Sequence, residues 1–157
     1  MFSLVYSSIA SPKLDSSNLD KIHSTAMAFN KNNSITGCLL YHEGKFVQLL
    51  EGSKYHVINL YENIVKDTRH ISPIVLHTEH SHFRMFKDWS MIFHNLSSKA
   101  LKDSSYKIQC FTDMFNSSNA NCIPSSSKLK FWRESFEIFN KTPSCNPKEK
   151  HLHLSAT

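Results

Sequence analysis

The 157-residue sequence predicts an α+β fold of the ferredoxin-like kind, a sandwich with the element order β-α-β-β-α-β-β. Three observations carry this prediction. A short alternating stretch opens the chain, a β-hairpin lies between residues 35 and 52, and a helical stretch lies on each side of that hairpin. Two further helical stretches near the C-terminal end are expected to cover the face of the sheet that the first two helices leave open.

The hairpin spans Ile35–Gly52, where two apolar runs flank the turn-forming pair Glu43-Gly44. In the second run the side chains alternate, so that Phe46, Gln48 and Leu50 share one face. Gln48 therefore lies in the middle of a surface that is otherwise apolar. Because an unpaired amide there would cost roughly 1–3 kcal/mol, Gln48 is expected to have a polar partner.

The elements before the hairpin follow from residue spacing. Phe2–Ser7 alternates as a strand, and a serine-rich loop with Pro12 follows it. Ser17 and Asp20 have the spacing of a capping box, which predicts that a helix begins at Ser17 and ends near Asn30. The expected apolar stripe of this helix consists of Leu19, Ile22, His23, Ala26 and Met27.

After the hairpin in the sequence, a second helix is expected over about Lys54–Asp67. A fourth strand over Ile74–Thr78 begins after Pro73, and a fifth covers roughly Lys87–Phe93. The helix is expected to bury Val57, Tyr61, Ile64 and Val65, and the last strand to place Trp89, Met91 and Phe93 on one face.

The strands of the hairpin are apolar on both faces, since Val47 and Leu49 lie opposite the Gln48 face. Two tail helices, over roughly Ser98–Asn116 and Ser127–Asn140, are candidates to cover the second face, either beneath the sheet or between two subunits. The stripe expected to pack from the later helix is Leu129, Trp132, Phe136 and Phe139.

Composition sets the class of protein. A hydrophobic fraction of 40% supports a real core, and the net charge of +5 is spread along the chain, so nucleic acid is not a favoured partner. No apolar stretch approaches the roughly 20 residues that span a bilayer, no secretory signal opens the chain, and the cysteines form no C-x-x-C pair. We expect a cytoplasmic protein with a sandwich domain over 1–95, a helical extension over 96–142 and a flexible tail over 143–157.

Polar side chains are expected to gather on the helix-covered side of the sheet and at the helix ends that border it. Between two helices and a sheet they would converge on a slot with donors and acceptors on its rim. Ile22 and Ile64 would form its apolar walls, a geometry that suits a flat heteroaromatic ligand. The polar set is Tyr6, Asn30, Gln48, Asp67, Arg69 and His70.

At these positions the sequence resembles the BLUF family, the blue-light sensors that use flavin. The resemblance covers residues 1 to about 93, in the family order and at family-like spacing, and the joint match is highly specific. From Asn95 onward no motif is assignable; in short members of the family that region forms two helices. The matching residues are Val5-Tyr6-Ser7-Ser8, Asn30, Ile35-Thr36-Gly37, Phe46-Val47-Gln48-Leu49-Leu50-Glu51-Gly52, Asp67-Thr68-Arg69-His70 and Trp89-Ser90-Met91.

The resemblance implies a bound flavin, FAD with FMN as the alternative, and assigns a role to each site residue. Gln48 looks like the glutamine that hydrogen-bonds the flavin near N5 and the C4 carbonyl, with Tyr6 bonded to it. Asn30 resembles the asparagine that holds the C4 carbonyl from the other side. Asp67 and Arg69 match residues that address N3–H and the C2 carbonyl, and His70 lies in the same match.

The resemblance also implies a switch without substrate turnover. Tyr6 would briefly give an electron and a proton to the excited flavin, and Gln48 would be left rotated or tautomerised. The signal would pass through Trp89 and Met91 to the tail helices and an unidentified protein partner, while a homodimer through the sheet or tail is left open. Position 63 is Asn, where family members often carry a basic residue near the phosphates. Lys31 or Lys66 would then take that role, and the choice between FAD and FMN stays open.

Three alternatives compete with this interpretation. A small hydrolase of the acylphosphatase kind would need a phosphate loop after the first strand, yet Ser8–Lys13 holds no Gly-rich cradle. A ferredoxin-like module that binds RNA would need exposed aromatic side chains on the central strands. A metal site at His77, His80 and His82 lacks a cysteine or carboxylate to complete it, so no metal is expected.

Overall fold

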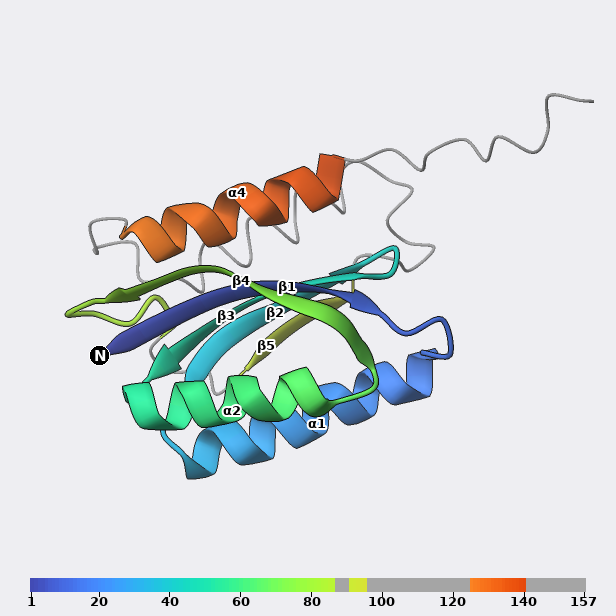
Figure 1. The fold of residues 1–157 in the computed structure, drawn as a ribbon, viewed down its shortest axis with the longest axis horizontal. Coiled ribbons are helices and arrows are strands. Elements are labelled where there is room, and N and C mark those ends of the chain that lie inside the picture. Colours follow the sequence, from blue (N-terminus) through green and yellow to red (C-terminus); the bar gives the residue numbers. More distant parts are fainter. Residues whose placement is uncertain (87–90, 96–124, 141–157) are drawn as a thin grey trace, which may run out of the picture.

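The computed structural model describes residues 1–86, 91–95 and 125–140. These residues form a five-stranded sheet with the strand order β4-β1-β3-β2-β5, flanked by helices (Figure 1). The elements are β1 (Phe2–Ala10), α1 (Ser16–Asn32), β2 (Thr36–His42), β3 (Lys45–Gly52), α2 (Lys54–Lys66), β4 (His70–His80), β5 (Ile92–Asn95) and α4 (Ser126–Asn140).

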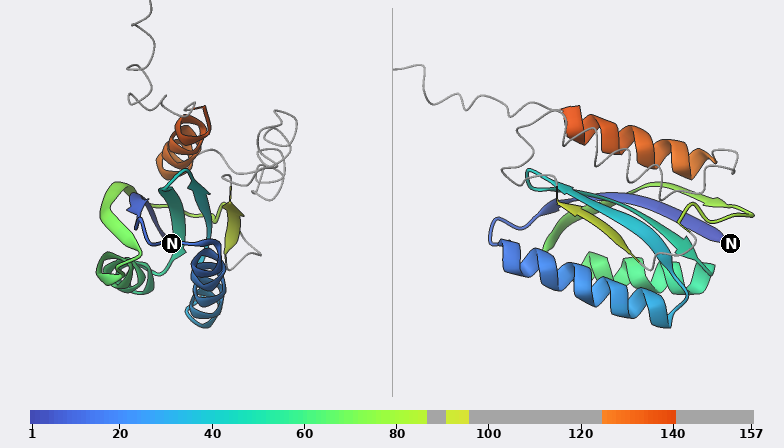
Figure 2. Two further views of the ribbon diagram at one scale, coloured as in Figure 1. Left: turned by 90° about the vertical axis from the view of Figure 1, so that its right-hand side faces the viewer. Right: turned by 180° about the vertical axis from the view of Figure 1, so that it is seen from behind.

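The helices from the first half of the chain and the helix near its C-terminal end lie on opposite faces of the sheet (Figures 1 and 2). Helices α1 and α2 lie side by side under one face of the sheet, and α4 lies across the other face (Figures 1 and 2). Strands β4, β1, β3 and β2 pair antiparallel, whereas β5 pairs parallel to β2 at the edge. The predicted ferredoxin-like α+β fold is confirmed.

Two apolar cores result, one on each side of the sheet. The larger core packs β-strand residues such as Leu4 and Leu50 against Leu19 and Ile22 of α1 and Val57 of α2. The smaller core lies under α4 and consists of Val5, Cys38, Leu40, Val47, Leu49, Met85, Phe86 and Phe131. The expected covering of the second face is therefore confirmed for the later tail helix; the earlier one, Ser98–Asn116, lies outside the described residues.

The hairpin turn has the expected geometry. Glu43 and Gly44 both have positive φ, 44° and 78°, as the two central positions of a type I′ turn require. This turn sets the register in which Leu39 lies opposite Gln48. Both side chains consequently belong to the face that α1 and α2 cover.

Helix α1 begins earlier than the capping-box spacing predicts. Its N-cap is Asp15, whose carboxylate accepts the N–H of Asn18 at 2.8 Å, and Ser17 lies within the first turn. Asp15 accepts from Ser17 Oγ as well, at 2.9 Å, because an ionised carboxylate is acceptor-only and offers several sites. The expected burial of Met27 is wrong: this side chain is 42% exposed.

Strand β4 is longer than predicted, since it runs through Pro73. The strand lies at the edge of the sheet, where a missing N–H removes no ladder bond, and a register shift with a positive φ at Ser72 accommodates the proline. On α2 the buried residues are Val57 and Leu60, and Val65 is exposed against expectation. Strand β5 begins at Ile92, later than expected, and Trp89 lies outside the described residues.

Helix α4 turns a different face to the sheet from the one that its apolar stripe predicts. Phe131 is fully buried against Phe86, whereas Leu129 and Phe136 are 57% and 60% exposed. The polar groups explain the rotation, because the N–H of Ser127 donates to Glu79 of β4 at 3.0 Å and Lys128 lies near the buried carboxylate of Glu51. Trp132 is partly buried in the same core, and the side chain of Phe139 lies outside the described residues.

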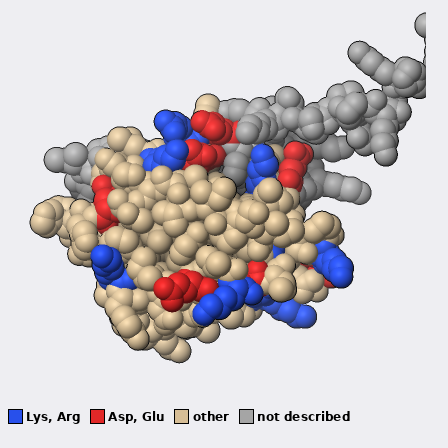
Figure 3. Space-filling view, viewed as in Figure 1, with Lys and Arg blue, Asp and Glu red and all other residues tan. Residues whose placement is uncertain are grey.

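The charged side chains alternate in sign over the face seen in Figure 3. On α4, Lys130 and Arg133 lie 2.7 and 3.7 Å from Glu134, so that basic and acidic groups occur together. A broad surface without Lys, Arg, Asp or Glu separates these groups from the charges around α2 (Figure 3). Among the described helices, none combines the length and apolarity that crossing a membrane requires.

Candidate functional site

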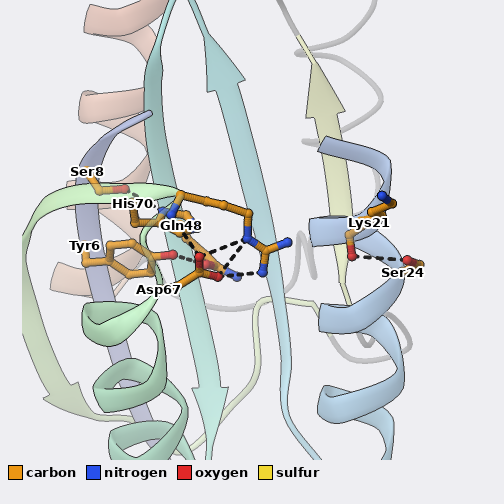
Figure 4. A network of polar contacts seen from close by, with 8 residues as sticks. Tyr6, Ser8, Lys21, Ser24, Gln48, Asp67 and His70 are labelled. Atoms are coloured by element: carbon orange, nitrogen blue, oxygen red, sulfur yellow. Dashed lines mark hydrogen bonds and ion pairs between the residues drawn. The ribbon is translucent and has the colours of Figure 1, made fainter. Parts of the chain in front are cut away.

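A cavity of about 170 Å³ opens between α1, α2 and the sheet. Apolar side chains from both helices form its walls. Polar side chains from β1 and β3 lie on its floor, and those of the segment after α2 lie along its rim (Figure 4). The lining residues are Tyr6, Ile22, Thr25, Ala26, Phe29, Leu39, Gln48, Leu60, Asn63, Ile64, Asp67, Arg69 and His70.

A chain of hydrogen bonds crosses the floor of this cavity. Tyr6 and Gln48 lie directly opposite each other on β1 and β3, and the Tyr6 hydroxyl donates to Oε1 of Gln48 (Figure 4). The amide nitrogen of Gln48 donates to Sδ of Met91 at 3.4 Å. The amide of Gln48 therefore has a distinct partner at each end, and all three side chains are at most 3% exposed.

Burial keeps Tyr6 a neutral phenol. It raises the pKa of Tyr6 well above the ordinary value, and the nearby Tyr61 and Asp67 act in the same direction. The ring of Tyr61 lies 5.4 Å from that of Tyr6, between centroids. A buried phenol of this kind keeps its proton as a donor to Gln48 at all ordinary pH values.

Asp67 and Arg69 form the charged part of the rim. Helix α2 ends at Lys66, and the next residues turn so that Nε of Arg69 donates to both carboxylate oxygens of Asp67, at 2.9 and 3.0 Å. Nη2 of Arg69 adds a third bond at 2.5 Å. Burial acts to raise the pKa of Asp67, but the hydrogen bonds and charge of Arg69 outweigh it and hold that pKa below the usual range.

His70 closes the rim where β4 begins. Its Nδ1 lies 2.8 Å from Oγ of Ser8, and its ring lies 4.6 Å from that of Phe46 between centroids. Burial lowers the pKa of His70 to about 4, with the Asp67 charge acting to raise it and the Arg69 charge to lower it. The imidazole is therefore neutral at pH 7.

The structure brings nearly all of the predicted ligand residues to the cavity. Those that line it are Tyr6, Ile22, Gln48, Ile64, Asp67, Arg69 and His70. Asn30 is buried in the last turn of α1 beside Phe29, and it is not one of the lining residues among those described. Its backbone carbonyl accepts the N–H of Ile35 at 2.9 Å and so fixes the turn into β2.

Several lining residues were not predicted as site residues from the sequence. Thr25, Ala26 and Phe29 follow Ile22 at helical spacing, which could have identified them as one face of α1. Leu60 lies four residues before Ile64 on α2, and Leu39 lies opposite Gln48 across the hairpin. Ser8, the partner of His70, belongs to the Val5-Tyr6-Ser7-Ser8 match, but nothing in the sequence pairs it with His70.

The chemistry of the lining fits a flat heteroaromatic ring. Aliphatic side chains from α1 and α2 can contact its faces, while an amide, a carboxylate and a guanidinium can bond its polar edge. Within the described ranges, no group of three or more His, Cys, Asp or Glu side chains is placed to hold a metal ion. The fold and site together define a small α+β domain that encloses a planar ligand between two helices and a sheet.

Comparison with known proteins identifies the family. The family model for BLUF, described as sensors of blue-light using FAD, matches residues 1–92, which is more than half of the chain. The chain belongs to the BLUF family. It is therefore, by family, a blue-light sensor of the flavin-using class.

Known proteins share this domain in different settings. A photoactivated adenylate cyclase subunit beta from Euglena longa is 43% identical over 74 residues, which cover 47% of this chain and 9% of that protein. A bacterial light-regulated adenylyl cyclase structure shows 34% identity with a TM-score of 0.60, over 74% of this chain and 35% of that one. The photo-activated state of BlsA shows 28% identity and a TM-score of 0.62, over 90% of this chain and 96% of that one.

Proposed function

We propose that this chain is a light-driven switch, without substrate turnover, in which the Gln48 amide reverses its hydrogen bonds beside a flavin bound between α1 and α2. The observation that carries the proposal is the buried chain Tyr6–Gln48–Met91 on the cavity floor. A primary amide has a donor end and an acceptor end, so one side chain can present either to the ligand. The Euglena relatives are named as adenylate cyclase subunits, but the match to this chain covers only 9% and 10% of the first two, so their cyclase activity is not part of this proposal.

The residues that would hold the flavin divide by chemistry. Ile22 and Ile64 supply apolar contacts to the ring faces, Asp67 and Arg69 supply an acceptor and donors for the pyrimidine edge, and His70 completes that edge. Asn30 at the end of α1 would address the C4 carbonyl. FAD is the proposed cofactor. FMN remains the alternative because Asn63, a cavity residue on α2, carries no charge for a phosphate.

Lys31 and Lys66 are the proposed phosphate contacts. They are the basic residues in the last turns of α1 and α2, and both side chains are exposed. Exposed lysines can follow a flexible phosphate tail without a fixed geometry, because the ammonium is a compact charge on a flexible stem.

When bound, oxidised flavin supplies the absorption of blue light and, once excited, a strong one-electron oxidant. Tyr6 is placed to donate an electron to that oxidant, because its hydroxyl proton is already directed at Oε1 of Gln48 and can leave along that bond. A phenol that gives up an electron becomes strongly acidic, so the proton moves along this bond and returns when the electron returns. The tyrosine ends unchanged, and the amide of Gln48 ends rotated or tautomerised.

The output follows from the second partner of the amide. When the N–H end of Gln48 no longer faces Met91, the sulfur loses its donor, and Met91 directly precedes β5 at the edge of the sheet. We propose that Met91 and Trp89 carry the change into the extension over 96–142, which then acts on a protein partner. Residues 1–95 would be the sensor unit, and 143–157 a tail without a part in the switch.

The test is the absorption spectrum of the purified full chain. We expect a yellow protein whose flavin band shifts reversibly to longer wavelength under blue light. Tyr6→Phe and Gln48→Leu should each retain flavin and lose the shift, whereas Tyr55→Phe, which alters a 75% exposed tyrosine on α2, should photoconvert normally. A colourless protein that takes up neither FAD nor FMN would overturn flavin binding. A normal shift in Tyr6→Phe would overturn the role of Tyr6 alone.

A further inference from the structure

Ser8 contacts His70 from the side away from α2, although it is not a lining residue of the cavity. It is 4% exposed and lies on β1 two residues beyond Tyr6, so both side chains point to the same side of the sheet (Figure 4). Oγ of Ser8 lies 2.8 Å from Nδ1 of His70. With Phe46 at 4.6 Å and Tyr6 at 6.3 Å between ring centroids, this contact fixes the plane of the imidazole.

The proton on the imidazole decides what His70 can offer to a ligand. A neutral imidazole has one N–H and one bare nitrogen, and the two nitrogens can exchange these roles. Two charged groups beside the ring, Asp67 and Arg69, act on its pKa in opposite directions, and the ring of Tyr6 lies 6.3 Å from it between centroids. Among the described residues, the hydrogen bond that the His70 ring makes is at Nδ1, so the direction of that bond bears on which tautomer forms.

The hydroxyl of Ser8 favours one of them. If Nδ1 carried the proton, it would donate to the serine oxygen, and the serine hydrogen would need a second acceptor. Within the described part of the chain, His70 is the hydrogen-bond partner that this hydroxyl has. If the serine donates to Nδ1 instead, a single bond satisfies both groups, which is the cheaper arrangement at a buried site.

We propose that Ser8 is a positioning residue whose hydroxyl donates to Nδ1 and holds His70 in the Nε2–H tautomer. His70, which lines the cavity, then presents a hydrogen-bond donor at its other ring nitrogen. The consequence for ligand binding rests on the proposed function. The pyrimidine edge of a flavin carries carbonyl oxygens, so a second donor beside Arg69 adds to its binding, whereas a bare nitrogen would repel it.

The tautomer can be measured directly on the ¹⁵N-labelled full chain at pH 7, with and without FAD. In long-range ¹H–¹⁵N spectra, the protonated and bare ring nitrogens differ widely in chemical shift and in coupling pattern. We expect the Nε2–H pattern for His70, identified as the signal that disappears in His70→Gln. Ser8→Ala should change it to a mixture or to the Nδ1–H pattern, and Ser8→Thr, which keeps the hydroxyl, should preserve it.

The matched control is Ser7→Ala, which removes a hydroxyl from the neighbouring residue on the opposite face of β1 and should leave the His70 signals unchanged. We further expect Ser8→Ala to weaken FAD binding by roughly three- to tenfold, the effect of one hydrogen bond. An Nδ1–H pattern in the unmodified chain, or an unaltered pattern in Ser8→Ala, would overturn the proposal. Because the tautomer is also measured without FAD, failure of flavin binding affects the proposed function and leaves this test intact.

Discussion

Lowering the pH from 7 to 5 is expected to reduce the free energy of unfolding, because His70 is buried as a neutral imidazole. Burial lowers the pKa of His70 from 6.5 to about 4, so the unfolded chain binds a proton at a pH where the folded chain does not. Above pH 6.5 both states are neutral and the full stability is present. As the pH falls through 6.5 toward 4, the unfolded state gains protons first, and stability is lost.

The size of the effect follows from linkage. Each unit of pKa difference corresponds to about 1.4 kcal/mol, so His70 alone should remove about 2 kcal/mol of unfolding free energy between pH 7 and pH 5, and about 3 kcal/mol in total below pH 4. Urea unfolding of the flavin-free chain at pH 7, 6 and 5 gives these free energies directly. This range lies above the titration of most carboxylates, which keeps their contribution small.

Comparison with His70→Gln isolates the histidine. The variant can be less stable at every pH, but its unfolding free energy should fall by about 2 kcal/mol less than that of the unmodified chain between pH 7 and pH 5. His82→Gln, which alters an exposed histidine in the loop after β4, should follow the unmodified chain. Parallel curves for the unmodified chain and His70→Gln would refute the assignment of a buried neutral imidazole at this site.

Two further predictions concern the sheet. Gly37→Ala should cost roughly 3 kcal/mol or more in urea unfolding, because the new Cβ would lie 2.1 Å from the carbonyl oxygen of Leu49. Gly52→Ala should cost clearly less, because its Cβ would meet side-chain carbons at 3.3 Å and the carbonyl oxygen of Ser34 at 3.5 Å. Equal losses would contradict the steric reason. Glu51→Ala should cost roughly 2–4 kcal/mol, because it leaves the buried N–H groups of Met85 and Phe86 without their acceptor. Glu62→Ala on the exposed side of α2 should change stability by less than about 0.5 kcal/mol, and a similar small change for Glu51→Ala would show that the N–H groups find another acceptor.

The fold could be predicted because its strongest signals are local. Period-two alternation identifies β1 and the second hairpin strand, an apolar run identifies the first, and Glu43-Gly44 fixes their register through its turn type. Tyr6 on β1 pairs with Gln48 on β3, so the two side chains face the same helices. That is why most of the predicted ligand residues lie together at one cavity.

The predictions that were wrong or missing have a common physical cause. Tertiary contacts, which the local sequence does not show, determined which face of a helix is buried and where a strand begins. Helix α4 buries Phe131 together with Ser127, Lys128 and Ser135, whereas Leu129 of the predicted apolar stripe stays exposed, and the Ser127 N–H donates to Glu79 of the sheet. Pro73 ends a strand in isolation but is tolerated at a sheet edge. The pairing of Ser8 with His70 was not predicted, because no local pattern marks a serine on β1 as the partner of a histidine 62 positions away.

Two polar residues on β3, Gln48 and Glu51, determine which parts of the segment before β5 a hydrogen-bond change at the cavity can reach. Gln48 faces the cavity and reaches Met91, whereas Glu51 faces α4 and accepts the N–H groups of Met85 and Phe86. Burial raises the pKa of Glu51, and those two N–H groups, followed by the charges of Lys128 and Arg84, oppose that rise. The chain before β5 is thus tied to one central strand from both faces of the sheet.

A reversal of the Gln48 amide alters only one of these two ties. Arg84 strengthens the other one, because its guanidinium donates to the carbonyl oxygens of Ser34 and Glu51 at 2.7 and 2.6 Å. We therefore expect the switch to act at Met91 and β5 while the Glu51 contacts keep residues 84–86 in place. Hydrogen exchange under blue light tests this: exchange at β5 should rise while the amides of Met85 and Phe86 stay protected, and simultaneous loss of protection at both would show that the sheet opens as a unit.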